Sequence, residues 1–160
     1  MDLTIRNYLA RSENEIVLAA SIKKLSDDPD AKKFFQIDGS LTFYSSVIAH
    51  SYYSIFYAAK AILLAKGIET GSPDAHKKTL DAFKEHLVDS GFLDVKLFEI
   101  YKKMVVRAEA LLGIFKAEKK ERGDFTYNTI PQANQEPAED SLRNAKTFVA
   151  NITKIIGALK

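Results

Sequence analysis

Residues 40–66, SLTFYSSVIAHSYYSIFYAAKAILLAK, are the stretch that decides the fold of this 160-residue chain. Apolar side chains recur at helical spacing over most of the circumference of this segment. A helix that is hydrophobic nearly all round lies inside a protein, so we expect a central helix from Ser40 to Lys66. Gly67 follows it, and glycine readily adopts the left-handed conformation that commonly ends a helix.

Three more long helices are predicted from apolar residues that recur every three and four positions. They run from Leu3 to Leu25, from Asp94 through Phe115, and from Glu136 to Leu159. The last has the cleanest apolar stripe, and Pro137 stands where proline favours a first helical turn. No segment sustains the alternation that marks a β-strand, so the pattern predicts an all-α fold.

A shorter helix is predicted between the second and fourth. Ser72 has the side chain of an N-cap, Pro73 suits the first helical position, and the helix closes near Gly91. The first two long helices are joined by a polar stretch that contains Phe34 and Phe35. We expect both rings to fold back onto the bundle, because an adjacent exposed pair of phenylalanines would cost free energy.

These elements fit a single domain, residues 1–160, folded as an antiparallel up-and-down bundle of four long helices and one short helix. A chain of this length buries about two thirds of its unfolded surface, which is enough for a hydrophobic core. If consecutive helices alternate in direction, the end of the fourth helix lies near the turn after the second. That end of the bundle would gather Lys66, His76 and Arg122.

Composition excludes several classes of function. The chain has no cysteine, which rules out disulfides and thiolate chemistry and suits a reducing interior, so we expect a cytoplasmic protein. The N-terminal residues include acidic side chains, and no segment has the roughly 18 uninterrupted apolar residues of a membrane span, so no membrane association is expected. The net charge of +2 falls far short of the basic excess typical of nucleic-acid binding.

Metal and cofactor chemistry is not expected either. A di-iron carboxylate bundle requires Glu three residues before His, yet Val47, Pro73 and Phe83 stand three residues before the histidines. Glycine-rich phosphate loops are also absent from the sequence. We therefore predict no metal site and no bound cofactor.

Three motifs occur in a recognisable order: SYYSIFYAAKAILLAKGI at residues 51–68, DAHKKTLDAFKEHLV at 74–88 and RGDFTY at 122–127. In this order they resemble the HEPN domain, the higher eukaryotes and prokaryotes nucleotide-binding domain. The resemblance implies an up-and-down helical bundle that is commonly a homodimer. It also implies a nucleotide- or protein-binding module or a ribonuclease toxin, and many such proteins are encoded beside a minimal nucleotidyltransferase that acts as the antitoxin.

Ribonuclease members of that family carry an arginine followed by a histidine four to six residues later, and no arginine of this chain has that spacing. We therefore interpret the chain as a nucleotide- or protein-binding module without catalytic residues, partnered by a nucleotidyltransferase in a toxin-antitoxin-like system. One alternative is a ribonuclease toxin with a rearranged site, formed by Arg122 and Asp124 with His76 or His50. A scaffold without a ligand is the other.

Four residues of the central helix are the first candidate site. His50, Tyr53, Tyr57 and Lys60 share one stripe at spacings of three and four residues. Aromatic faces stack on nucleobases and a lysine attracts phosphate, so the stripe could bind a nucleotide. The tyrosines could instead bury their rings at a homodimer interface, which is the interpretation we favour.

The second candidate site is His76 with Arg122, Asp124 and Tyr127, which come together if the helices alternate as expected. Arginine can clamp a phosphate with two hydrogen bonds, histidine can transfer a proton near neutral pH, and the carboxylate can orient either group. These four residues are the candidates for binding a nucleotide or RNA. An ion pair between Arg122 and Asp124 that ends the fourth helix is the alternative.

Overall fold

The computed structural model describes residues 1–115 and 134–159 of the chain. All regular structure in these ranges is helical, which confirms the all-α prediction. The helices are, in chain order, α1 (Leu3–Asp27), α2 (Pro29–Phe34), α3 (Tyr44–Ala65), α4 (Ala75–Ala82), the π-helix η1 (Phe83–Val88), α5 (Val95–Leu112) and α7 (Gln135–Ala158).

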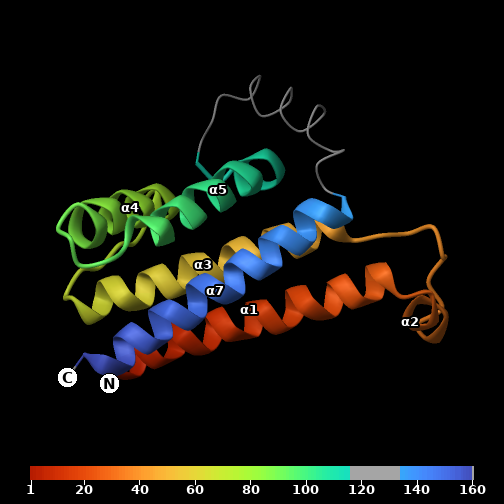
Figure 1. Cartoon of the computed structure of the whole chain (residues 1–160), viewed down its shortest axis with the longest axis horizontal. Coiled ribbons are helices and arrows are strands. Elements are labelled where there is room, and N and C mark those ends of the chain that lie inside the picture. Colours follow the sequence, from red (N-terminus) through yellow and green to blue (C-terminus); the bar gives the residue numbers. More distant parts are fainter. Residues whose placement is uncertain (116–133, 160) are drawn as a thin grey trace.

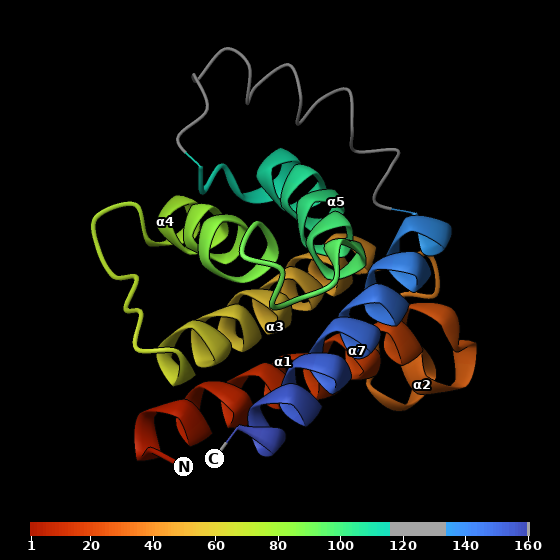
Figure 2. The same ribbon diagram turned by 60° about the vertical axis from the view of Figure 1, so that its left-hand side comes forward.

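The four long helices form a bundle in which α3 has α1, α5 and α7 as neighbours (Figure 1). Their directions alternate along the chain, since α1 and α5 run one way and α3 and α7 run the other. The up-and-down arrangement of the long helices is therefore confirmed. The N-terminus and the end of α7 lie close together in both ribbon views (Figure 2).

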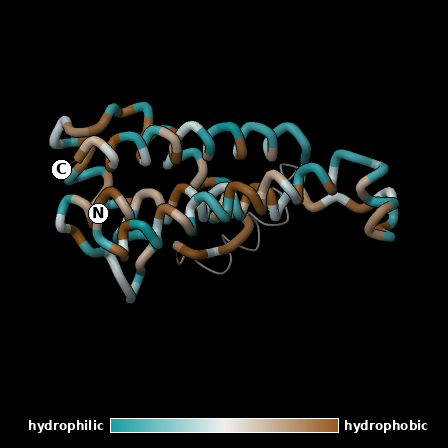
Figure 3. The backbone as a smooth tube through the Cα atoms, turned by 90° about the horizontal axis from the view of Figure 1, so that it is seen from below, coloured by the Kyte–Doolittle hydropathy of each residue, from teal (hydrophilic) through white to brown (hydrophobic). Residues whose placement is uncertain are grey.

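The core forms around α3 because its sequence is apolar on most sides. Ile55, Ile62 and Leu63 have no exposed surface. Small residues let α1 approach closely, and the buried Ser12 hydroxyl donates a hydrogen bond of 2.6 Å to the Ser54 carbonyl oxygen of α3. Bands of hydrophobic residues recur along the long helices (Figure 3), as expected when each helix buries one face.

An aromatic cluster holds the short helical segment against the bundle. The Phe83 ring of η1 lies 5.3 Å from Tyr101 of α5 and 5.6 Å from Phe148 of α7, measured between ring centres. All three side chains are fully buried. Edge-to-face and tilted contacts of this kind add to the stabilisation from burial, so η1 is fixed by two long helices.

The connection between α1 and α3 differs from the prediction. It contains α2, and the rings of Phe34 and Phe35 do not fold back: they are 81% and 62% exposed. Their predicted burial was wrong because α2 turns Lys32 inward instead. The Lys32 side chain is buried, and its ammonium donates a hydrogen bond of 3.1 Å to the Gly39 carbonyl oxygen.

The short helix begins later than predicted, at Ala75. Asp74 has a backbone φ of 59°, in the left-handed region, so the helix does not extend back through it to Ser72 and Pro73. After one short α-helical stretch the chain widens into η1, which ends shortly before Gly91. The end of the element was therefore predicted correctly and its start was not.

The combined α4 and η1 segment runs in the same direction as α3. His76 at its start stacks on Phe56 in the middle of α3, with ring centres 4.1 Å apart. Phe92, just after η1, lies with its ring centre 4.1 Å from the ammonium of Lys66 at the end of α3. The prediction had the short helix run opposite to the central helix, but in the structure the loop before α4 reverses the chain direction. The end of α5 therefore lies near His76, which Phe115 contacts, and not near Lys66 as predicted.

One helix in the described part of the chain, α3, is long and apolar enough to cross a membrane. In this bundle 67% of its most apolar window is buried by other parts of the protein. Burial of this extent is typical of the central helix of a bundle.

Candidate functional site

The α3 residues singled out from the sequence lie along one flank of the helix and face α1. All four are half-buried: His50, Tyr53, Tyr57 and Lys60. The α1 helix runs antiparallel to them and contributes Tyr8, Arg11 and Glu15, which are also three and four residues apart. We call these seven residues the aromatic stripe.

Glu15 organises one end of the aromatic stripe. Its carboxylate lies 2.5 Å from His50 Nδ1 and 3.7 Å from Arg11 Nε. The Arg11 guanidinium lies 4.8 Å from the centre of the Tyr57 ring, a cation–π contact, and the His50 ring lies 6.2 Å from Tyr53. The polar groups at this end are therefore paired within the chain.

Lys60 occupies the other end. Its ammonium donates a hydrogen bond of 2.7 Å to the Thr70 carbonyl oxygen and lies 5.3 Å and 5.6 Å from the ring centres of Tyr8 and Phe56. Within residues 1–115 and 134–159, no carboxylate oxygen approaches this ammonium to 4.0 Å. A half-buried cation without a counter-ion retains positive charge that an anionic ligand can neutralise.

A pocket of about 210 Å³ opens beside Lys60, and we call it the Lys60 pocket. The start of α1, the end of α3 and the following loop line it, through Thr4, Tyr8, Lys60, Leu64, Ile68, Glu69, Thr70 and Gly71. Pockets that enclose a drug-sized molecule begin at about 300 Å³. The Lys60 pocket is therefore large enough for one end of such a ligand, with the rest outside it.

His76, the second residue of α4, lies beside the aromatic stripe. Its Nδ1 shares a hydrogen bond of 2.8 Å with the Tyr52 hydroxyl, and its ring stacks on Phe56 at an interplanar angle of 25°. The Tyr53 and Phe115 ring centres lie 6.1 Å and 6.0 Å away. The structure thus places a residue of the second predicted site next to the first.

The surroundings of His76 favour its neutral form. Burial lowers the pKa of His76 below its usual 6.5, and the positive charge of Lys60 lowers this pKa further. Burial raises the pKa of Tyr52 far above its usual 10.0, so that its hydroxyl keeps its proton. At neutral pH the hydrogen-bonded pair is therefore uncharged, and the Tyr52 hydroxyl fixes the orientation of the imidazole.

These groups together offer ring faces for stacking, an ammonium that has no carboxylate partner among the described residues, and a neutral imidazole. Rings with a nearby cation bind the base and phosphate of a nucleotide, and a neutral imidazole can accept a proton. No cluster of His, Asp and Glu that could hold a metal ion occurs in the described ranges.

Three of the predicted site residues, Arg122, Asp124 and Tyr127, lie outside the described residues. Their proximity to His76 therefore stays a prediction. Sequence reasoning missed the α1 side of the aromatic stripe and the role of Tyr52 as the partner of His76. The spacing from Tyr8 onward would have shown that three α1 residues share a face, but no sequence signal shows that this face meets α3.

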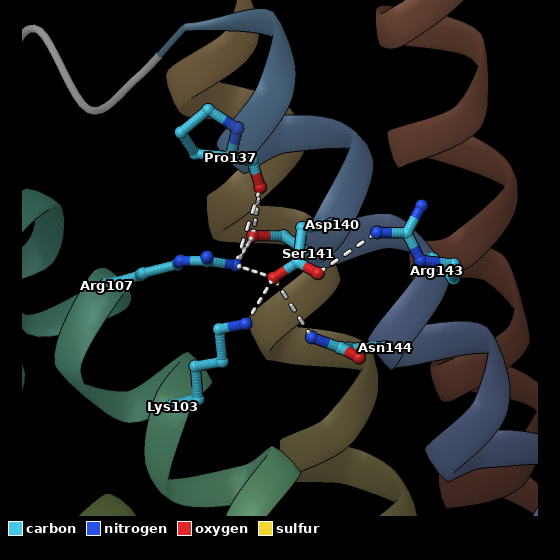
Figure 4. Close-up of polar contacts among 7 residues, drawn as sticks. All are labelled: Lys103, Arg107, Pro137, Asp140, Ser141, Arg143 and Asn144. Atoms are coloured by element: carbon cyan, nitrogen blue, oxygen red, sulfur yellow. Dashed lines mark hydrogen bonds and ion pairs between the residues drawn. The ribbon is translucent and has the colours of Figure 1, made fainter.

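A separate polar cluster joins α5 to α7 (Figure 4). Arg107 donates hydrogen bonds of 2.8 Å to the Asp140 carboxylate and 2.9 Å to the Ser141 hydroxyl. Lys103 and Arg143 lie 2.7 Å and 3.1 Å from the same carboxylate. Burial opposes ionisation, but the hydrogen bonds from Lys103 and Arg107 outweigh it and hold the pKa of Asp140 at about 2. This cluster links two helices through contacts within the chain.

The fold and the aromatic stripe define a class of protein: a small helical bundle with a partly open aromatic and cationic surface on its central helix. The HEPN domain family matches residues 29–155. This match spans more than half of the sequence, and the chain belongs to the HEPN family. The family predicted from the three motifs is confirmed.

Three relatives are similar to this chain, and two of them are named as putative toxins. A UPF0332 protein of Thermotoga maritima is 30% identical over 115 residues, 72% of this chain and 74% of its own length. In Methanocaldococcus jannaschii, the protein named "Putative toxin MJ0605" is 27% identical over 113 residues, 71% of each chain. "Putative toxin MJ0142" of the same organism is 40% identical over 57 residues, 36% of this chain and 37% of its own. No solved structure matches the chain significantly.

Proposed function

We propose that this protein is a toxin-like HEPN module that binds a mononucleotide through the Lys60 pocket and the adjoining rings. The half-buried ammonium of Lys60 carries the proposal: among the described residues no carboxylate lies within 4.0 Å of it, and a phosphate would supply the missing negative charge. Membership of the HEPN family and the names of two relatives support a toxin-like role.

The lining of the Lys60 pocket suggests how a nucleotide would lie. The phosphate would bind Lys60, sugar hydroxyls would donate to the Glu69 carboxylate at the pocket, and the base would stack on Tyr8, the aromatic residue of the pocket lining. A volume of about 210 Å³ suits a single terminal phosphate with part of its sugar. A free nucleotide or the phosphorylated end of an RNA therefore fits better than the interior of a strand.

The same α3 residues are also the candidates for a homodimer interface. In this structure α1 supplies contacts of the kind a partner subunit would make, from Glu15 to His50 and from Tyr8 to Tyr57. These contacts within one chain leave less of His50 and Tyr57 for a partner subunit to cover. A homodimer, a nucleotidyltransferase partner and a cytoplasmic location stay predictions, and light scattering of the purified protein tests the first of them.

A ribonuclease with a rearranged site is the second candidate, and the neutral His76 favours it. An imidazole in this form can accept the proton of a ribose 2′-hydroxyl, while Arg122 and Asp124 would supply charge. RNA cleavage by the purified protein that is lost in both His76→Ala and Arg122→Ala, with unchanged melting temperatures, would establish this candidate. It would also show that the protein does more than bind.

Isothermal titration calorimetry with AMP tests the proposed function. Lys60→Met keeps the apolar stem and removes the ammonium, so the Kd for AMP should rise about tenfold, as expected for a charge-assisted hydrogen bond worth ~1.5 kcal/mol. Lys102→Met is the matched control, because the Lys102 ammonium also lies over a ring, 5.6 Å from the centre of Phe98. No binding of AMP, or equal binding by Lys60→Met, would contradict the proposal.

A further inference from the structure

A second surface lies between the C-terminal half of α1 and the N-terminal half of α7, and we call it the α1–α7 groove. This open groove has a volume of about 880 Å³ and shares no residue with the Lys60 pocket. Leu142, which is buried, and the half-buried Ala20 give it an apolar base. Four of its lining residues are basic: Lys23, Lys24, Arg143 and Lys146.

Three carboxylates also line the α1–α7 groove, but donors within the fold already occupy them. Asp27 and Glu139 both pair with Lys23, at 2.5 Å and 3.3 Å. Asp28 accepts a hydrogen bond of 2.9 Å from the Asp30 amide at the start of α2. Asp27 and Glu139 are therefore engaged with Lys23, and Asp28 with a backbone amide, so the four cations that line the groove exceed its three carboxylates by one charge.

The other three basic residues keep charge available to a partner. Lys24 is 76% exposed and approaches Asp28 only to 4.0 Å. Arg143 is 69% exposed and lies 3.1 Å from Asp140, which two further cations share. Among the described residues, no carboxylate comes within ion-pair distance of Lys146. Positive charge thus flanks the apolar base from α1 and from α7.

We propose that the α1–α7 groove docks an acidic amphipathic helix of a partner protein. Leucine-like side chains of such a helix would cover Ala20 and Leu142, and its carboxylates would pair with the basic residues on both sides. None of the lining residues is aromatic, so the groove offers no ring on which the bases of a nucleic acid would stack. An acidic peptide therefore fits this surface better than RNA does.

Fluorescence anisotropy with a labelled peptide that repeats Glu and Leu at helical spacing tests this proposal. The test protein carries Lys24→Gln, Arg143→Gln and Lys146→Gln. The control carries Lys96→Gln, Lys102→Gln and Lys154→Gln, which remove the same net charge from exposed positions outside the groove. We expect the Kd for the peptide to rise about tenfold or more in the first protein and to stay within about twofold of wild type in the second.

Three results would overturn the proposal: no binding of the Glu and Leu peptide to the wild type, an equal loss of affinity in both triple variants, or displacement of the peptide by an oligouridylate that binds more tightly. Lys60→Met should leave peptide binding unchanged. Failure here is therefore distinguishable from failure of the nucleotide site, because each site has its own variant and its own probe.

Discussion

Replacing Asp140 by asparagine removes one charge from the cluster that joins α5 to α7 and keeps the shape of the side chain. In the folded protein the pKa of Asp140 is about 2, against a usual 3.8. A difference of this size corresponds to about 2 kcal/mol of stabilisation at neutral pH. The carboxylate is 22% exposed and two of its cations are more open, so we expect solvent screening to reduce the loss to about 1–2 kcal/mol.

The loss of stability in Asp140→Asn should depend on pH, and this dependence is the most specific test of the prediction. Because folding lowers the pKa of Asp140, its stabilisation is fully present above pH 3.8 and is lost as the pH falls toward 2. Urea unfolding followed by circular dichroism should show Asp140→Asn less stable than wild type by the same amount at pH 7 and pH 5. The gap should narrow between about pH 4 and pH 3.

Arg143→Gln is the control for Asp140→Asn. Arg143 contacts the same carboxylate but is 69% exposed, so its loss should cost less than about 0.5 kcal/mol. The reasoning is refuted if Asp140→Asn is as stable as wild type at pH 7. It is refuted equally if the difference between the two proteins persists unchanged at pH 3.

Two further predictions concern the site and the α1 to α3 connection. In an NMR titration the pKa of His76 should lie below 6.5. Lys60→Met should raise the pKa of His76, because the variant removes the positive charge of Lys60 and leaves the effect of burial. An unchanged pKa of His76 would argue against this electrostatic contact. Phe34→Ser and Phe35→Ser should each change the free energy of unfolding by less than about 0.5 kcal/mol, whereas the fully buried Phe148→Ala should cost about 3–5 kcal/mol in urea titrations. Strong destabilisation by either exposed substitution would show that these rings pack against the bundle.

The four long helices were predictable from local patterns: α3 is apolar on most sides, and the other three have apolar residues every three and four positions. Local sequence patterns predicted the structure less well in the connections between the helices. Asp28 followed by Pro29 is a start signal for α2, yet the polar composition around it was interpreted as a break. The burial of Phe34 was predicted from its hydrophobicity alone, and Phe34 is in fact exposed. Only the tertiary packing shows that Lys32 takes the inward position.

The candidate site was predictable in part for a similar reason. Spacing on one helix placed His50, Tyr53, Tyr57 and Lys60 on a common face, and this needs only helical geometry. The contact between that face and α1, and the position of His76 against the middle of α3, depend on how helices pack. In particular the left-handed Asp74 and the loop before it set where α4 begins, and periodicity carries no information about a loop path.

Chemical-shift mapping of AMP binding in an ¹H–¹⁵N NMR spectrum tests the nucleotide site most directly. We expect the largest shifts at the amides of Thr70 and Gly71 and along the end of α3. The Lys60→Met variant should need about tenfold more AMP to reach the same shifts, while Lys102→Met should titrate like the wild type. An absence of shifts at high AMP concentration, or shifts confined to the α1–α7 groove, would contradict the assignment of the Lys60 pocket as the nucleotide site.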